Sequence, residues 1–361
     1  MNYRKFPAII LLSLFSGLIY GQSFSEKKTV RKSVRVNKET TLELINKYGT
    51  IHITPGTTDS VTIRVETEAT ATSLERLRKV FDGININISE TSYMVRAQTD
   101  FTQNISMLFE SFKGMTSKII PYDSRIEINY FITAPDYINL KIDNKYGDVY
   151  MEDNSGICTI TISNGSFKAN TLNKVSGMNF TFCDAKINSI NDGTIDASFS
   201  ELAIGESKNL IVNSVSSRFD LQKTGRINAK SRRDKYFIGS VESINGDSYF
   251  SDYRIEVLSK EINLLPKYGS INVDLIEERF ELISIKSNFT DISLDFEPSA
   301  AYNVDIRHIN AFVVMPDQDT KVENKAINED KREYMTFGTV GKNPEKSKVI
   351  IDATRGNIYL K

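Results

Sequence analysis

The two histidines, His52 and His308, are the residues of this chain best suited to metal binding or acid–base catalysis. Each lies in a strand-like run without a Cys, His, Asp or Glu partner at metal-ligand spacing. A zinc site needs three or four such ligands, so we interpret both histidines as structural residues on polar strand faces. The chain also has no Gly-x-Ser-x-Gly elbow, phosphate-binding loop, dinucleotide fingerprint or calcium-binding nonapeptide repeat. The sequence therefore predicts no enzyme activity, no cofactor and no metal.

A second group that could do chemistry is the charged run Arg232-Arg233-Asp234-Lys235. Such a run could form the basic centre of a β-helix polysaccharide lyase, but nothing near it suggests an acid–base pair. We interpret it as a solvated edge that blocks unwanted strand pairing.

The recurring tyrosines form the candidate binding surface. Tyr48, Tyr146 and Tyr268 each precede a glycine, and Phe199 and Phe289 occupy similar places in looser copies of the same motif. Exposed aromatic rows could serve as platforms for sugars or partner proteins. The alternative is that the rings stack over the corners of the fold and shield its apolar stripe.

The tyrosines belong to a weak sequence repeat, which sets their spacing along the chain. Each copy has a glycine two residues before an apolar–x–apolar alternation. The clearest copies are residues 46–53, 144–151, 266–273 and 354–360. Looser copies occur about 15 to 21 residues apart between Gly147 and Asn310, which suggests one coil of a stacked β architecture.

This pattern predicts an all-β fold, a single-stranded right-handed β-solenoid (β-helix) of short coils. A single strand with one apolar face cannot bury that face alone, whereas stacked coils bury a continuous stripe. The Asn-Gly corners at Asn164-Gly165 and Asn245-Gly246 suit backbone with positive φ. The same dipeptides also favour hairpins, so an antiparallel β-sandwich is the structural alternative.

The chain divides into three predicted parts. Residues 1–21 have the basic, apolar and small-residue order of a signal peptide, with cleavage after Gly21, and the apolar run is too short to span a bilayer. Residues 22–135 are a β-rich part with minor helical insertions, near residues 73–81 and 105–112. Residues 136–361 are the solenoid, with a polar insertion, expected as a long loop, near 316–344. The strand-like runs near 349–351 and 358–360 are expected to close and cap the solenoid.

Charge and cysteine content narrow the function further. A formal net charge of −1, from 45 basic and 46 acidic residues, indicates no nucleic-acid partner. If Ile160 and Ile162 point inward, Cys158 does too, and if Phe180 and Phe182 point inward, Cys183 points outward. This favours two free thiols over a disulfide.

The motifs resemble those of a known family. Lys145-Tyr146-Gly147-Asp148-Val149 after Tyr130-Phe131-Ile132-Thr133-Ala134-Pro135-Asp136, followed by Gly-x-apolar coils, is similar to the adhesin family of Bacteroidetes that carries a domain of unknown function, DUF4097. The resemblance covers most of the chain after residue 21. It implies an adhesin-head type of β-solenoid and an envelope location, and it brings no catalytic residues.

We therefore expect an exported protein, in the periplasm, on the cell surface or secreted, without a transmembrane segment after signal cleavage. Its expected role is structural or adhesive, with a glycan or an envelope or surface protein as the partner. Two alternatives are a periplasmic accessory protein of envelope stress signalling and a carbohydrate-active β-helix enzyme.

Overall fold

The computed structural model describes residues 23–103, 124–342, 344 and 346–361. The predicted signal peptide, residues 1–21, and the second helical candidate, residues 105–112, lie outside the described residues. Within this part of the chain no helix is long and apolar enough to cross a membrane.

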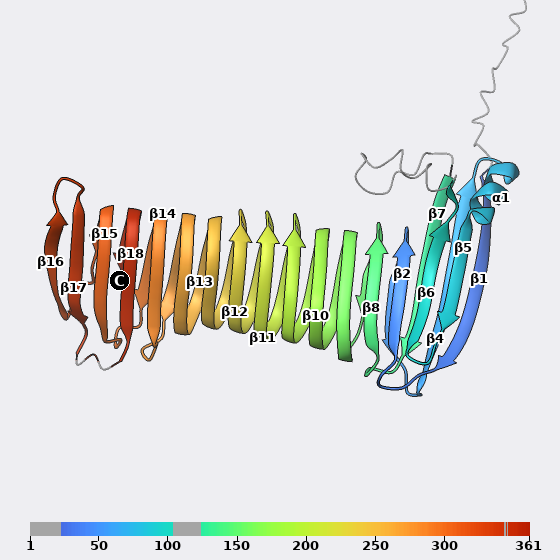
Figure 1. The fold of residues 1–361 in the computed structure, drawn as a ribbon, viewed down its shortest axis with the longest axis horizontal. Coiled ribbons are helices and arrows are strands. Elements are labelled where there is room, and N and C mark those ends of the chain that lie inside the picture. Colours follow the sequence, from blue (N-terminus) through green and yellow to red (C-terminus); the bar gives the residue numbers. More distant parts are fainter. Residues whose placement is uncertain (1–22, 104–123, 343, 345) are drawn as a thin grey trace, which may run out of the picture.

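The fold is all-β, with one helix among the described residues (Figure 1). The elements in chain order are β1 (Phe24–Arg35), β2 (Thr41–Lys47), β3 (Ile51–Pro55), β4 (Ser60–Ala71), α1 (Leu74–Asp82), β5 (Ile84–Glu90), β6 (Met94–Phe101), β7 (Ser124–Ala134), β8 (Asn139–Lys145), β9 (Val149–Met151), β10 (Asn154–Ser198), β11 (Glu201–Val215), β12 (Arg218–Arg232), β13 (Lys235–Ile276), β14 (Leu282–Phe296), β15 (Tyr302–Val314), β16 (Thr320–Asn328), β17 (Glu333–Val340) and β18 (Lys348–Leu360).

The middle of the molecule is a solenoid of stacked coils, as the repeat predicts. The pairs β10–β11, β11–β12 and β12–β13 are all parallel, with paired residues 17 positions apart, as at Glu201 and Arg218. Strands β10 and β13 are 45 and 42 residues long because they continue through several coils. Within β10, for example, the hydroxyls of Thr159 and Ser176 lie 2.7 Å apart on neighbouring coils.

Each coil buries its apolar positions in one continuous core. In the coil that begins at Glu201, the side chains of Leu202, Ile204, Leu210 and Val212 are buried. The same positions in neighbouring coils hold apolar residues, so burial continues along the rod. This is the period-2 pattern that the sequence displays, and burial of about 25 cal/mol per Å² of apolar surface stabilises the stack.

The first coil is separated in sequence from the second but lies directly on it. Strand β2 pairs in parallel with β8, and β3 pairs with β9, so that Asn46 lies opposite Asn144. The two clearest copies of the repeat are therefore neighbours in space. The N-terminal end of the rod is formed by β1, which precedes the first copy, and by β4 to β7, which lie between the two copies in sequence. There β1 pairs antiparallel with β4, β4 with β7, and β5 with β6.

Helix α1 lies at one corner of this N-terminal end, against β4 and β1 (Figure 1), where the sequence predicts a helix. The Ser73 hydroxyl caps it by accepting a hydrogen bond from the Arg76 N–H at 3.3 Å. Leu77 and Val80 are buried, because their spacing places both on the face toward the sheet.

The C-terminal end differs from the sequence prediction in two ways. Strand β18 is not the closing strand, because it lies between β14 and β15 and pairs in parallel with both. The polar segment near 316–344, expected as a long loop, contains the hairpin β16–β17, in which β17 pairs antiparallel with β15. The hairpin covers the last coil, and its exposed polar strand β16 forms the edge.

Candidate binding surface

The feature that organises the surface is one sharp corner in each coil. At this corner a non-glycine residue adopts positive φ, between 49° and 65°. In the order in which the coils stack, these corner residues are Tyr48, Tyr146, Asn164, Phe182, Phe199, Ser216, Arg233, Phe250, Tyr268, Phe289, Arg355 and Asn310. We call them the corner column. A left-handed conformation costs about 1–2 kcal/mol for such residues, so the stack must supply a compensating contact.

Ring stacking supplies that contact along much of the column. Tyr48 and Tyr146 stack with ring centroids 5.4 Å apart, and Phe182 and Phe199 stack at 5.1 Å. Tyr268 stacks on Phe250 at 4.7 Å and on Phe289 at 5.1 Å. Aromatic pairs of this kind contribute about 0.5–1.5 kcal/mol beyond the area that they bury.

The structure thus places all three predicted residues, Tyr48, Tyr146 and Tyr268, in the corner column. We call the seven aromatic members of the column the aromatic ridge: Tyr48, Tyr146, Phe182, Phe199, Phe250, Tyr268 and Phe289. Whether the ridge binds a partner stays a prediction.

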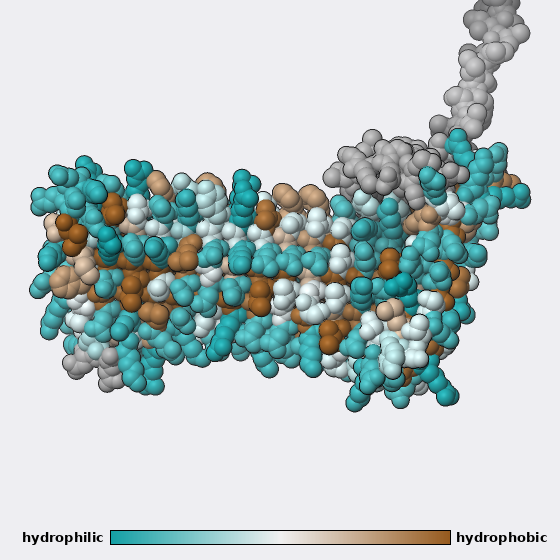
Figure 2. All heavy atoms as spheres, viewed as in Figure 1, coloured by the Kyte–Doolittle hydropathy of each residue, from teal (hydrophilic) through white to brown (hydrophobic). Residues whose placement is uncertain are grey.

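The ridge is exposed as well as stacked. Phe182 and Phe199 are 56% and 54% exposed, values unusual for phenylalanine. Because neighbouring rings stack, each ring of the ridge has at least one face covered by another ring. On the face that Figure 2 shows, hydrophobic residues form an interrupted band along the rod, bordered by hydrophilic side chains.

The corner explains an error in the sequence analysis. Phe182 was expected inside and Cys183 outside, but Cys183 is buried and Phe182 is exposed. The positive φ of Phe182 turns the backbone, so that the alternation of faces shifts by one residue there. Both cysteines are buried and free, and burial raises the pKa of the Cys158 thiol to about 12, which makes it unreactive.

The same shift changes the interpretation of the charged run at residues 232–235. Arg232, Arg233 and Lys235 are exposed, as expected for a solvated edge. Asp234 is only 1% exposed, however, because it follows the corner residue Arg233 and points inward. Its carboxylate accepts hydrogen bonds from the Ser217 and Arg232 N–H groups and from the Ser214 and Ser231 hydroxyls, at 2.7–2.8 Å.

The two histidines lie in different environments. His52 is half-buried on the outer face, as expected, whereas His308 is buried and its Nδ1 donates to the Ala311 carbonyl, with the two atoms 3.1 Å apart. Alternation with the buried Val304 and Ile306 could have revealed this inward position. In the described part of the chain, no group of three or more His, Cys, Asp and Glu residues could hold a metal ion.

His308 should make the folded state sensitive to mild acid. Burial lowers the pKa of His308 from its usual 6.5, and the hydrogen bond to Ala311 only partly opposes this. The unfolded chain therefore binds the proton first, and stability should fall as the pH drops below 6.5, by at most about 1.4 kcal/mol per pH unit. Urea unfolding at pH 7.5 and 5.5 measures this loss. His308→Phe keeps a ring over Tyr334 and should show a smaller loss, whereas an equal loss in both proteins would contradict the assignment.

A second ring stack, which the sequence does not predict, lies on the outer face near the N-terminal end. Phe131 stacks on His52 at 5.3 Å, and His52 stacks on Tyr150 at 5.1 Å. Cations cover both ends, with the Arg64 guanidinium 4.0 Å from the Phe131 ring centre and the Lys168 ammonium 5.6 Å from that of Tyr150. The five residues come from strands β4, β7, β3, β9 and β10, so no local sequence signal joins them.

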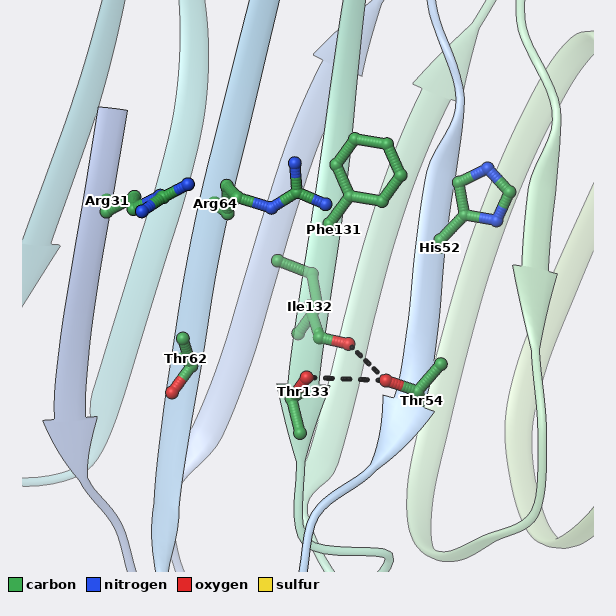
Figure 3. Close-up of a pocket in the computed structure, with 8 residues that line it drawn as sticks. All are labelled: Arg31, His52, Thr54, Thr62, Arg64, Phe131, Ile132 and Thr133. Carbon is green, nitrogen blue, oxygen red and sulfur yellow. Dashed lines mark hydrogen bonds between the residues drawn. The ribbon is translucent and has the colours of Figure 1, made fainter. Parts of the chain in front are cut away.

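This stack borders a hollow of about 490 Å³, which we call the N-terminal hollow (Figure 3). Its lining residues are Arg31, His52, Thr54, Thr62, Arg64, Phe131, Ile132 and Thr133. The lining combines two guanidinium groups, three threonine hydroxyls, the Phe131 ring and the His52 imidazole. Such a surface can hold an anion and donate hydrogen bonds.

Comparisons with known proteins do not show a family for this chain. No protein-family model matches the chain, and no curated protein matches it. A solved structure named a "putative cell adhesion protein" from Clostridium sporogenes is 12% identical, covers 93% of this chain and 99% of its own, and has a TM-score of 0.21. A "putative adhesin" from Bacteroides fragilis is 12% identical, with 75% and 97% coverage and a TM-score of 0.30. A "putative lipid binding protein" from Parabacteroides distasonis is 12% identical, with 74% and 96% coverage and a TM-score of 0.36. With TM-scores below 0.5, these likenesses carry no weight in assigning a function.

Proposed function

We propose that this chain is an exported, non-catalytic binding protein of the cell envelope or cell surface, which attaches to a partner through its aromatic ridge. The observation that carries the proposal is the ridge itself, with Phe182 and Phe199 more than half exposed on a rod of parallel coils. Apolar side chains gathered on a folded surface mark interaction sites, because their exposure is unfavourable unless a partner covers them. Membership of the DUF4097-type adhesin family is part of this proposal.

The geometry of the ridge favours a protein surface over a sugar as its partner. Sugars bind aromatic residues through the flat face of the ring, and in a stacked pair such as Phe182 and Phe199 each ring covers one face of the other. Ring edges, by contrast, pack well against apolar and aromatic side chains. We therefore assign the ridge to contact with an envelope or surface protein.

The corner column itself suggests variants that remove the ridge without unfolding the coils. Asn164 and Asn310 occupy the same corner with the same positive φ, and asparagine tolerates this conformation better than phenylalanine. The triple variant Phe182→Asn, Phe199→Asn and Phe250→Asn should therefore fold. Each replacement removes an apolar side chain worth about 1.5–3 kcal/mol on full burial, so binding should fall by at least about tenfold.

The measurement is retention of protein-coated beads on intact bacterial cells and on cells stripped of surface proteins by protease. We expect beads coated with the wild-type chain to be retained on intact cells only, and beads coated with the triple variant to be retained on neither kind of cell. The unfolding temperature of the triple variant should stay close to that of the wild type. The matched control is Phe237→Asn, an aromatic residue on the outer face away from the corner column. Retention of the triple variant at the wild-type level, or no retention of the wild type, would refute the proposal.

A further inference from the structure

The N-terminal hollow contains two arginines at directly opposed positions. Arg31 of β1 and Arg64 of β4 are partners in the antiparallel register, and both point to the outer face. Like charges directly opposite each other destabilise a sheet, by about 0.2–1 kcal/mol. An arrangement of this kind is unfavourable in the free protein and becomes favourable when an anion lies between the two groups.

Among the described residues, only one of the two guanidinium groups has an acidic partner. Arg64 forms an ion pair with Glu66 and stacks on Phe131. Glu66 is shared, because it also forms an ion pair with Lys27 at 2.6 Å. Arg31 is exposed, and its side chain has no hydrogen bond or ion pair with any other described residue. The hollow therefore has one unpaired guanidinium group beside one that is already held in place.

Hydroxyl groups line the hollow beside the arginines. Thr62 and Thr133 are partners in the β4–β7 register, and the Thr54 and Thr133 hydroxyl oxygens lie 3.3 Å apart (Figure 3). Thr54 donates its one hydroxyl proton to the Ile132 carbonyl at 3.2 Å, so in the contact with Thr133 the Thr133 hydroxyl donates and the Thr54 oxygen accepts. The threonines thus form a row across neighbouring strands that runs parallel to the row containing Arg31 and Arg64.

We propose that the N-terminal hollow binds the acidic group of a sugar chain, a carboxylate or a sulfate. The arginines bind the anion through charge-assisted hydrogen bonds, since a guanidinium group matches the geometry of an oxyanion. The threonine row takes up the sugar hydroxyls, which both donate and accept. Because the hollow is open and lies on a flat sheet face, it can bind a sugar unit in the middle of a long sugar chain as well as one at the chain end. This site is independent of the aromatic ridge.

The test is binding of the full mature chain to acidic and neutral sugar chains of matched length. Isothermal titration with oligogalacturonate, which carries carboxylates, and with dextran sulfate separates the two anion types, and unmodified dextran is the neutral probe. We expect binding to at least one acidic chain and none to dextran. Arg31→Gln should weaken binding by about tenfold, since it removes one charge-assisted contact.

The matched control is Arg35→Gln, because Arg35 lies on the same strand and the same face, is exposed, and lies outside the lining of the hollow. It should change binding by less than about twofold, as expected for a distant exposed charge. Arg31→Gln should also unfold at the same temperature as the wild type or higher, because it removes the like-charge pair. The double variant Thr62→Val and Thr133→Val should weaken sugar binding and leave the affinity for inorganic sulfate unchanged.

Three results would overturn the proposal. The first is an equal effect of Arg31→Gln and Arg35→Gln, which would indicate charge attraction without a site. The second is equal binding of dextran and the acidic chains. The third is that neither acidic chain binds. None of these results bears on the aromatic ridge, whose test uses different variants and a different readout.

Discussion

Replacement of Gly147 by alanine is expected to destabilise the fold by about 3 kcal/mol or more, at the upper end of what overpacking costs. A Cβ atom at this position would lie 2.0 Å from the carbonyl oxygen of Gly49 on the neighbouring coil and 2.7 Å from its carbonyl carbon. Both are backbone atoms, so the clash can be relieved only if the two coils separate. Urea unfolding followed by circular dichroism measures the loss.

Gly177→Ala is the matched control for this prediction. Gly177 lies on a coil of β10, and an added Cβ there would meet nothing within 4 Å. Its effect should stay within about 0.5 kcal/mol, as for other surface substitutions. If the two variants lost equal stability, close approach of the coils at the Gly49–Gly147 step would not be the reason for glycine there.

The second large effect is expected at Asp234. Its buried carboxylate accepts four hydrogen bonds, from two backbone N–H groups and two serine hydroxyls. Asp234→Ala would leave the two N–H groups without an acceptor in the core, at a cost of about 1–3 kcal/mol each. We therefore expect a total loss of about 3 kcal/mol, measured by chemical unfolding.

The neighbouring coils suggest the comparison variant, Asp234→Ser. In the coils on either side, Ser217 and Ser251 occupy the equivalent position, and the Ser251 hydroxyl oxygen accepts the Asp234 N–H at 3.1 Å. A serine at position 234 could accept the Ser217 N–H in the same way, so Asp234→Ser should be more stable than Asp234→Ala by about 1 kcal/mol. Equal stability of the two variants would show that the lost hydrogen bond is not what matters.

The sequence predicted the corner column better than it predicted the faces of the strands beside it. The glycine after Tyr48, Tyr146 and Tyr268 marks the corner, since residues next to a sharp turn are restricted in type. At Phe182 and Phe199 no glycine follows, and only the backbone shows that the alternation shifts there. A period-2 pattern predicts burial only while the strand stays extended, which is why alternation gives the wrong side for Cys183. For Asp234 the charged run predicts a solvated edge, but the corner at Arg233 turns its side chain inward.

The N-terminal hollow could not be predicted, because it depends on strand pairing between distant segments. Arg31 and Arg64 meet through the β1–β4 register, and Phe131 and His52 meet through the β7–β3 register. Each of these residues, taken alone, is an ordinary outward-facing residue of an alternating strand. Nothing in the local pattern states which strand lies beside which.

By itself, the sequence determined that the chain is all-β, that its strands bury one face each, and that they repeat once per coil. These features are local, because alternation and corner residues act within a few positions of the chain. Only the tertiary structure decided the order of the coils, in which β2 lies on β8 and β18 lies between β14 and β15. The repeats are alike enough to pair in more than one order, so the order depends on the full set of contacts between coils. The aromatic ridge follows from the repeat, and the N-terminal hollow follows from that order.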